Sequence, residues 1–538
     1  MTENSRFRYN GNRVRRLVWR LVFVAAATAL FQARSWEART KDGAAELARL
    51  KAATGGAAWD TVSRISATGE KTSFGLRGTY RSVEDLTHGF FEVKCDYKIF
   101  VNEEGFDSAG RWRQDNSGQI HPLDSMEAKE VAVTEAYLAA RGYLFPERVP
   151  AAISSLGSSR EGAAIYLRII ATPTHGRVVT LWINASTHLL DRAVLQLSIG
   201  EKVIRYADYR RVGSLILPFS ISVEHRDENE TGVAVVQSYD VAAPSNQPEI
   251  VRPAPVLADF VMANNADEVR VPGYLDGASG FFIVFAKING RGPFPFILDS
   301  GGHDILTPFA VRELGLESFG KGFSTGAGAG STPTEFTRVN SVAIGAATIA
   351  SQPFTILHID LGAARDPAGK SQPIAGILGL ELFERFVVTV DYQHGILLLR
   401  LPAGTPAKAR SGIPMRFTSD MPVVEASLDG NAGWFNVDTG NNTDLIVFRT
   451  WAASNPMASL SKGPQMHGSS VGGAIDMRRG QARTFEIGDQ KLTDLTVLLA
   501  ADMEGSLSAK WEAGNIGNSV LRHFKVTFDY RSELIYLE

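Results

Sequence analysis

The chain has 538 residues, of which 44% are hydrophobic and 21% are charged, and its formal net charge at pH 7 is −3. The composition is that of an ordinary globular protein, and the chain is long enough for three or four domains. The net charge does not indicate binding to nucleic acid. Cys95 is the only cysteine and the ten histidines show no metal-ligand spacing, so we expect no disulfide, no metal and no cofactor.

Residues 1–33 have the pattern of an export signal peptide. Six arginines form a basic segment before an apolar run from Leu21 to Phe31, and small residues at Ala27, Ala29 and Ala33 offer cleavage sites. The apolar run has 11 residues, fewer than the roughly 20 that a membrane span needs. We therefore expect an exported protein, periplasmic or secreted, with membrane anchoring by an uncleaved N-terminal segment as the alternative.

Residues 40–241 predict an α+β domain. Residues 40–55 suit a short helix, and strand-like runs follow over 62–123. Asp124-Ser125 opens a second predicted helix that Gly142 ends, and further strands extend as far as Tyr239. The domain should be dominated by antiparallel sheet.

This order of elements resembles the periplasmic lipoprotein-carrier (LolA-like) half-barrel, and residues 104–115 resemble a turn-and-tryptophan pattern of such domains. The family holds acyl chains on a concave apolar face. The resemblance therefore implies an antiparallel-sheet, half-barrel-like domain and an envelope lipid or protein partner. A packed domain that supports the rest of the chain or docks its substrate is the alternative interpretation.

A proline-rich stretch follows. Four prolines between Ala242 and Pro255 predict an extended, semi-rigid linker over 242–267. The next strand should begin near Glu268, where the C-terminal half of the chain starts.

Two short triplets, Asp299-Ser300-Gly301 and Asp438-Thr439-Gly440, lie 139 residues apart, each after an apolar strand-like run. Upstream, Ile288-Asn289-Gly290 and Leu428-Asp429-Gly430 predict hairpin turns that lead into each triplet. A single such triplet is a weak signal, but two in matching surroundings are a strong one.

A second segment repeats with the triplets. Residues 376–392 and 514–530 align without gaps and are identical at 7 of 17 positions. They begin 77 and 76 residues after the aspartate of their triplet. The C-terminal half is therefore predicted to contain two copies of one lobe, over 268–402 and 403–538.

At these residues, about 268–538, the chain resembles the pepsin-like and retropepsin-like aspartic peptidases. Their lobe has the same order: a hairpin, Asp-Ser/Thr-Gly, a glycine-rich flap and an apolar-apolar-Gly segment behind the catalytic loop. Here the last segment is Ile377-Leu378-Gly379 and then Asn515-Ile516-Gly517. The resemblance implies a bilobal, mostly β fold with pseudo-twofold symmetry.

The resemblance implies that Asp299 and Asp438 are a catalytic pair. Two carboxylates in contact cannot both ionise cheaply, so they share one proton, an effect known from pepsin itself, a member of the resembled family. Ser300 and Thr439 would support the carboxylates through their hydroxyl groups. The triplet glycines, Gly301 and Gly440, would allow a tight turn and close backbone approach.

Two glycine-rich segments lie where the flaps belong. Their predicted flap residues are Gly326, Gly328 and Gly330 in the first copy, and Gly472 and Gly473 in the second. The first segment has no tyrosine, which pepsin-like flaps usually carry. Gly302-His303 and Asn441-Asn442, which follow the triplets, also depart from the family, where a small residue is usual.

Several of these residues also have interpretations that involve no catalysis. The alternative for the lobes is a degenerate pair that has lost catalysis. We expect His303 to be a surface or loop histidine and not a catalytic group, and Asp391 and Asp529 to end strands at hairpin turns.

The sequence thus predicts an aspartic endopeptidase that acts on polypeptide substrates as a monomer with intramolecular lobe pairing. The alternative is a non-catalytic envelope carrier for lipid, lipoprotein or peptide.

Overall fold

The computed structural model describes residues 40, 42–114, 118, 120–225, 230–243, 250, 252–254, 259–366, 368–402, 412–455, 463–501 and 505–538. The predicted export signal lies outside these residues, and so does much of the predicted linker. In this part of the chain the fold is mostly β, as predicted, with two large sheets and one small one. None of the helices described there is long and apolar enough to cross a membrane.

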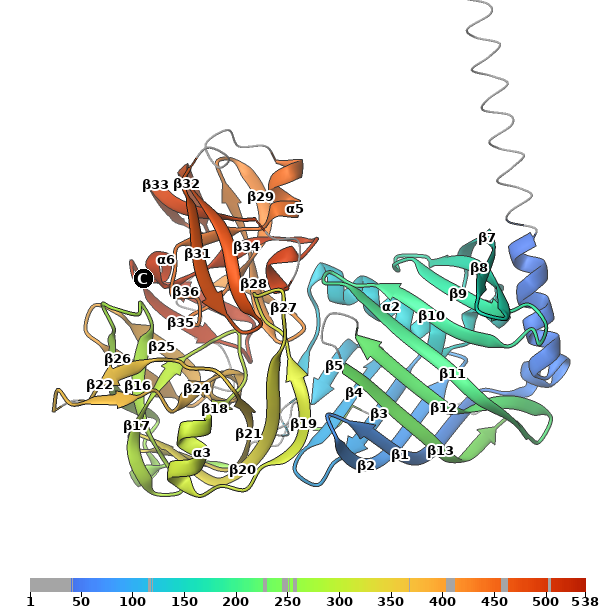
Figure 1. Cartoon of the computed structure of the whole chain (residues 1–538), viewed down its shortest axis with the longest axis horizontal. Coiled ribbons are helices and arrows are strands. Elements are labelled where there is room, and N and C mark those ends of the chain that lie inside the picture. Colours follow the sequence, from blue (N-terminus) through green and yellow to red (C-terminus); the bar gives the residue numbers. More distant parts are fainter. Residues whose placement is uncertain are drawn as a thin grey trace, which may run out of the picture.

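A 13-stranded antiparallel sheet forms the N-terminal half, which confirms the predicted sheet domain (Figure 1). The strands follow a meander, except that β1 pairs with β13, so the first and last strands are neighbours in the middle of the sheet. The strands are β1 (Arg64–Ser73), β2 (Leu76–Asp85), β3 (Phe91–Asp96), β4 (Val101–Asp107), β5 (Gly110–Gln114), β6 (Ile120–Pro122), β7 (Ala151–Glu161), β8 (Ala164–Pro173), β9 (Val179–Asn184), β10 (Leu190–Gln196), β11 (Glu201–Val212), β12 (Leu215–His225) and β13 (Glu230–Ala242).

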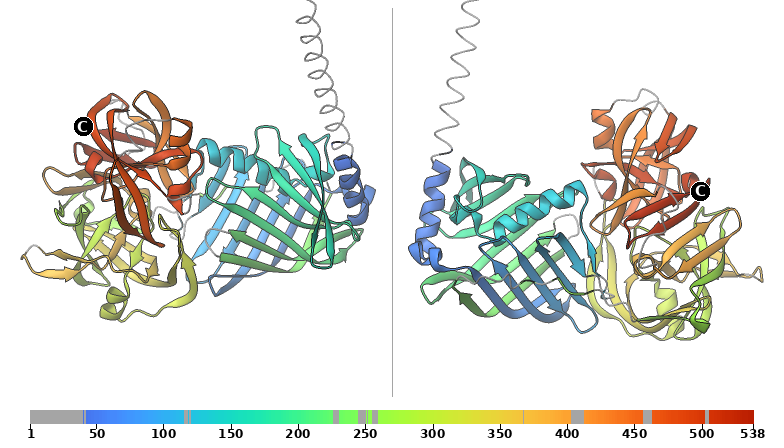
Figure 2. Two further views of the ribbon diagram at one scale, coloured as in Figure 1. Left: turned by 45° about the horizontal axis from the view of Figure 1, so that its top comes forward. Right: turned by 180° about the vertical axis from the view of Figure 1, so that it is seen from behind.

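The sheet curves, and helix α2 (Met126–Ala139) lies across one of its faces (Figure 2). The helix begins after Ser125, whose hydroxyl accepts a hydrogen bond from the Ala128 N–H at 3.1 Å, close to the predicted start. A helix over residues 42–54 and the short helices η1 (Gly56–Thr61) and η2 (Gly142–Leu144) complete this half.

Alternation along the strands explains how this half packs. In β9, Val179, Leu181 and Ile183 are fully buried while the residues between them are partly exposed, as expected where one face of a strand covers a core. These three residues belong to one hydrophobic cluster with Leu50 of the first helix and Leu138 of α2. The helices therefore cover the apolar face of the sheet.

The C-terminal half contains a 21-stranded sheet system and the two-stranded ribbon β22–β23. Its strands are β14 (Phe260–Met262), β15 (Glu268–Leu275), β16 (Phe282–Ile288), β17 (Arg291–Leu298), β18 (Ile305–Leu306), β19 (Phe319–Ser324), β20 (Thr332–Ile344), β21 (Ala347–Leu357), β22 (Ala363–Arg365), β23 (Ser371–Pro373), β24 (Gly376–Leu378), β25 (Val387–Asp391), β26 (Ile396–Arg400), β27 (Ile413–Thr418), β28 (Met421–Leu428), β29 (Asn431–Val437), β30 (Leu445–Val447), β31 (Gln465–Ser470), β32 (Gly473–Ile487), β33 (Gln490–Ala500), β34 (Glu512–Ile516), β35 (Lys525–Asp529) and β36 (Leu534–Leu537). Its helices are η3 (Ala263–Asn265), α3 (Pro308–Leu314), α4 (Leu380–Arg385), α5 (Arg449–Ser454), η4 (Ser506–Ser508) and α6 (Asn518–Leu521).

The internal repeat predicted from the sequence is present in the strand pairing. In the first lobe, the hairpin β16–β17 leads to a parallel pairing of β17 with β24, and β18 pairs with both β21 and β24. In the second, β28–β29 leads to β29 with β34, and β30 pairs with both β33 and β34. Both hairpin turns have left-handed backbone at the predicted residues Asn289-Gly290 and Asp429-Gly430.

The repeated Val-Thr-x-Asp-Tyr segments join the lobes. Strand β25 pairs antiparallel with β35, and the hydroxyl groups of Thr389 and Thr527 meet at 2.8 Å across this pairing. Both strands end at the aspartates, Asp391 and Asp529, whose carboxylates accept backbone N–H groups of the following turns. This agrees with the structural role predicted for the two aspartates.

The N-terminal sheet domain lies beside both lobes (Figure 1). Phe336 of β20 packs edge-on against Phe74 and Phe100 of the sheet domain, at ring-centroid distances of 5.5 and 5.2 Å. On the second lobe, the Ser198 hydroxyl donates a hydrogen bond to Glu512 at 2.8 Å, and the Arg177 guanidinium lies 3.3 Å from the Trp511 ring centroid. The sheet domain therefore bridges the two lobes.

Candidate active site

The two triplets lie at corresponding ends of strands β17 and β29. The backbone N–H of Asp299 donates to the Leu378 carbonyl at 3.0 Å, and that of Asp438 donates to the Ile516 carbonyl at 3.0 Å. Each acceptor belongs to the predicted segment behind the catalytic loop, β24 in one lobe and β34 in the other. These parallel pairings fix where each strand ends and therefore where each aspartate projects.

The structure brings the two aspartates together. A Cβ atom on Gly440 would lie 2.3 Å from Cγ of Asp299, and one on Gly301 would lie 3.6 Å from Cγ of Asp438. Each triplet glycine therefore packs against the carboxylate of the other triplet. At Gly440 the close approach leaves no room for a side chain, which is the physical reason for glycine there.

Reciprocal hydrogen bonds connect the triplets beneath the carboxylates. The Thr439 hydroxyl accepts the Ser300 N–H at 2.8 Å and donates to the Leu298 carbonyl at 2.9 Å. The Ser300 hydroxyl accepts the Thr439 N–H at 3.1 Å and donates to the Val437 carbonyl at 2.9 Å. Ser300 and Thr439 are both fully buried. Each lobe thus supplies the hydroxyl group that satisfies the backbone of the other.

Burial and mutual repulsion perturb the pair. Desolvation and the nearby Asp438 charge raise the pKa of Asp299 to about 7. Burial also raises the pKa of Asp438, against the opposing effect of hydrogen bonds from Asn515 and from the backbone of Gly440 and Asn441. The pair can therefore carry one shared proton near neutral pH, which is the ionisation state that water activation requires.

The supporting tyrosines of the repeat were not predicted from the sequence. The Tyr530 hydroxyl donates to the Ser300 carbonyl at 2.5 Å. Its counterpart Tyr392 donates to Asn518 at 2.7 Å, and the Asn518 amide donates to the Thr439 carbonyl at 2.8 Å. The sequence signal for this role is a tyrosine at the same position of both copies, but the hydrogen-bond partners of the tyrosines follow only from the fold.

The two predicted flap segments meet each other. Gly326, Gly328 and Gly330 lie in the loop between β19 and β20, and Gly472 and Gly473 lie at the turn between β31 and β32. The Gly328 N–H donates to the Val471 carbonyl at 3.0 Å, and the Gly330 N–H donates to the Gly472 carbonyl at 2.8 Å. A Cβ on Gly328 would lie 2.5 Å from the Gly472 backbone, so this contact also needs glycine.

His303 lies in a loop, as predicted, but it is held by two carboxylates. Its ring contacts Glu381 at 2.9 Å and Asp420 at 3.0 Å, and its side chain is 34% exposed. Burial alone would lower the pKa of His303, but the two carboxylates raise it well above its usual range. The histidine is therefore a charged connection between the lobes, located two residues after the first triplet.

The sheet domain joins the same network. Asp420 also contacts Arg113 at 3.0 Å and His121 at 3.0 Å, and the second ring nitrogen of His121 lies 2.6 Å from Glu384. Burial alone would lower the pKa of His121, but Glu384 and Asp420 raise it to about 10. No local sequence motif indicates this network, because its members come from three parts of the chain.

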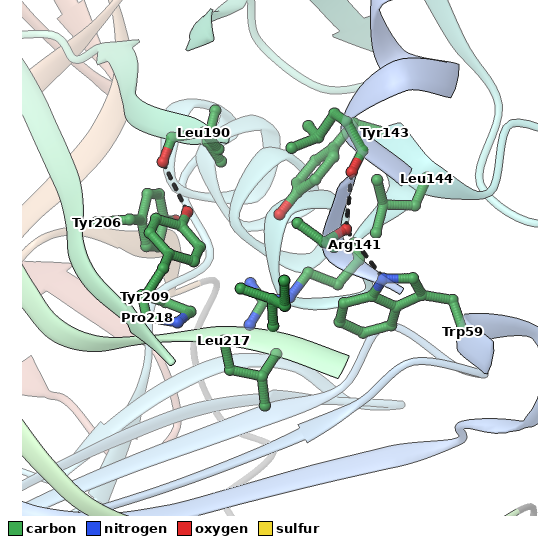
Figure 3. Close-up of a pocket in the computed structure, with 12 residues that line it drawn as sticks. Trp59, Arg141, Tyr143, Leu144, Leu190, Tyr206, Tyr209, Leu217 and Pro218 are labelled. Atoms are coloured by element: carbon green, nitrogen blue, oxygen red, sulfur yellow. Dashed lines mark hydrogen bonds between the residues drawn. The ribbon is translucent and has the colours of Figure 1, made fainter. Parts of the chain in front are cut away.

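A separate small pocket lies in the sheet domain, with a cavity volume of about 30 Å³. The rings of Trp59, Tyr143 and Tyr206 stand around Arg141 (Figure 3), which forms a 2.7 Å ion pair with Glu84. The lining residues are Leu50, Thr54, Trp59, Arg141, Tyr143, Leu144, Leu190, Tyr206, Tyr209, Ile216, Leu217 and Pro218. Among the described residues, no group of three or more His, Cys, Asp or Glu side chains could hold a metal ion.

Residues 284–382 and 424–520 each match the aspartyl protease family. The two matches cover the two lobes separately, and each includes one triplet. No curated protein is significantly similar to the chain in sequence.

Solved structures are similar to parts of the chain. A retropepsin-like aspartic protease from Rickettsia conorii is 22% identical, with 25% of this chain and 90% of that chain covered and a TM-score of 0.18. A putative outer membrane lipoprotein-sorting protein domain from Vibrio parahaemolyticus is 10% identical (39% and 95% covered, TM-score 0.29). A LolA superfamily protein from Nitrosomonas europaea is 14% identical (34% and 87% covered, TM-score 0.25).

Proposed function

We propose that the chain is an aspartic endopeptidase whose active site is formed by Asp299 and Asp438. The observation that carries the proposal is the pairing of the two carboxylates across the lobes, with the glycine of each triplet against the opposite carboxylate. The match of both lobes to the aspartyl protease family supports it. A scaffold without catalysis would gain nothing from two buried carboxylates that repel each other.

The proposed chemistry is general acid–base catalysis with water as the nucleophile. The ionised aspartate takes a proton from a water held between the carboxylates, while the protonated aspartate donates a hydrogen bond to the carbonyl oxygen of the scissile bond. The attacking water adds to the carbonyl carbon, and a proton from the pair then reaches the leaving nitrogen as the C–N bond breaks. The reaction needs no covalent intermediate.

The proposed substrate is an extended polypeptide outside the cytoplasm. Strand hairpins that end in the two glycine-rich flap segments offer backbone N–H and C=O groups, which suit recognition of an extended chain by strand-like hydrogen bonds. The basic, then apolar, N-terminus supports export to the periplasm or beyond, with a membrane-anchored form as the alternative. Because 268–402 and 403–538 supply one aspartate each, we propose that a single chain is active as a monomer.

Cleavage of a diverse peptide pool at pH 3 to 8 by the full chain and by Asp299→Asn tests this proposal. Cleavage by the wild-type chain that is lost in folded Asp299→Asn supports it. Failure of the folded wild-type chain to cleave any peptide across this range contradicts it.

The curved sheet domain (Figure 2), which contains the small pocket around Arg141, supports a second candidate function, a non-catalytic envelope carrier of lipid, lipoprotein or peptide. The mostly aromatic and aliphatic lining of this pocket suits an apolar group that is small enough to enter it. Binding of a fluorescent fatty acid that Leu217→Trp blocks, and that Asp299→Asn leaves unchanged, would support this function. Equal binding by the wild-type chain and Leu217→Trp would contradict it.

A further inference from the structure

The two carboxylates of the proposed pair differ in one side-chain hydrogen bond. Each accepts backbone N–H groups of its own loop: Asp299 from Gly301 at 2.9 Å and from Gly302, and Asp438 from Gly440 at 2.8 Å and from Asn441 at 3.1 Å. Asp438 Oδ2 also accepts the side-chain amide of Asn515 at 2.8 Å. The Asn515 contact breaks the symmetry of the repeat.

The sequence repeat explains the asymmetry. Asn515 pairs with Asn436, two residues before Asp438, and the equivalent residue of the first lobe, Ile377, pairs with Ile297. An isoleucine at this position has no hydrogen to donate to Asp299. Asn515 also replaces the first apolar residue of the segment that lies behind the catalytic loop.

The orientation of the Asn515 amide follows from its neighbours. The Thr443 N–H, which can only donate, contacts Asn441 Oδ1 at 2.9 Å, so Asn441 Nδ2 must face the other way. That Nδ2 lies 3.0 Å from Asn515 Oδ1, and the Asn515 Nδ2 therefore faces Asp438. Asn515 is 8% exposed, so water competes little for these bonds.

We propose that Asn515 is a positioning residue that keeps Asp438 ionised and leaves the shared proton on Asp299. The inference rests on the proposed peptidase function, and it assigns Asp438 as the base that activates water and Asp299 as the acid that faces the substrate carbonyl. An N–H donor stabilises the charged form of a carboxylate and cannot accept a hydrogen bond from its protonated form.

The other titratable groups that face Asp438 do not supply this bias. They are Asp299 from the opposite lobe and the phenols of Tyr392 and Tyr530. Burial raises the pKa of both phenols, so they stay neutral over the working range. The asymmetric donor set of Asp438 therefore decides where the proton resides.

Asn515→Ile, which copies Ile377, tests the assignment in the full chain. The loss of one hydrogen bond to a charged carboxylate should move the acid limb of the kcat/KM profile upward by about one to two pH units. The reciprocal variant Ile377→Asn should give Asp299 a donor and move the alkaline limb downward. Asn441→Gly, which copies Gly302, leaves Asn515 in place but releases its amide, and should move the acid limb in the same direction as Asn515→Ile by a smaller amount.

A measurement without substrate separates this inference from the proposed function. The measurement is an NMR titration of the Asp299→Asn variant labelled with ¹³C-aspartate. The Asp438 carboxyl signal is the one that disappears in the double variant Asp299→Asn/Asp438→Asn. Adding Asn515→Ile, or Asn441→Gly if the first variant does not fold, should raise the midpoint of its titration. An unchanged or lowered midpoint would overturn the role of Asn515 even if the chain cleaves peptides. A raised midpoint would sustain the role of Asn515 in setting the ionisation of Asp438, even if no peptide were cleaved and the peptidase function had failed.

Discussion

The hydroxyl group of Thr439 provides a direct test of how the two lobes are held together. Thr439→Val keeps the shape of the side chain but removes two hydrogen bonds, to the Ser300 N–H and to the Leu298 carbonyl. Both residues that meet here, Ser300 and Thr439, are fully buried, so water cannot replace the lost partner without local opening. At about 1 to 3 kcal/mol for each of the two buried groups left unsatisfied, the loss should be about 2 to 6 kcal/mol.

The assay is hydrogen–deuterium exchange of the full chain, with peptides that cover both triplets. A loss of about 2 to 6 kcal/mol corresponds to exchange that is roughly 30- to 20,000-fold faster at Ser300 and its neighbours. Thr418→Val is the matched control, because the buried Thr418 hydroxyl makes no hydrogen bond within the described residues. Equal exchange at the triplets in Thr439→Val and Thr418→Val would refute the reasoning.

Three further predictions concern the ionisation of Asp299, the ion pairs of His121 between the sheet domain and the lobes, and the close contact at Gly440. Because the pKa of Asp299 is raised to about 7, the shared proton is lost as pH rises through this value, and kcat/KM should fall above about pH 7; a flat profile to pH 9 would exclude a shared proton on this pair. His121 has a folded-state pKa raised to about 10, above its ordinary value of about 6.5, so its contribution to stability is complete below about pH 6.5 and is lost as pH rises through 10. Thermal unfolding should therefore show His121→Gln less stable than the wild-type chain at pH 6 and similar to it at pH 11, whereas a difference that grows with pH would contradict the ion pairs. Gly440→Ala would place a Cβ 2.3 Å from the Asp299 carboxyl and should reduce cleavage by at least about 100-fold, a loss typical of misplaced reacting groups. The control Gly277→Ala, whose Cβ would meet nothing within 4 Å, should leave the cleavage rate unchanged. Equal rates for the two variants would show that the carboxylates do not approach each other as described.

Local sequence patterns predicted the parts of the fold that neighbouring residues determine. The turns at Asn289-Gly290 and Asp429-Gly430 need left-handed backbone, which these residue types favour, and the structure has it at both places. The helix start at Ser125 follows from its capping hydroxyl. The repeat of triplet and downstream segment predicted that two similar lobes exist, and the strand pairing confirms it.

Long-range contacts could not be predicted in the same way. Tyr530 reaches Ser300, and Asp420 joins His121 to His303, across more than a hundred residues of sequence in each case. The sequence marks Tyr530 only as a repeated residue and Asp420 not at all. Their positions depend on how the lobes pair and on where the sheet domain docks, which no local pattern specifies.

The central claim is that one chain supplies both aspartates of one active site. Its most direct test is the cleavage rate of a single identified peptide by the wild-type chain, by Asp299→Asn, by Asp438→Asn and by an equimolar mixture of the two folded variants. The account predicts cleavage by the wild-type chain alone, because no molecule in the mixture carries both carboxylates. Cleavage by either variant would contradict the shared role of the pair, and activity restored in the mixture would contradict its formation within one chain.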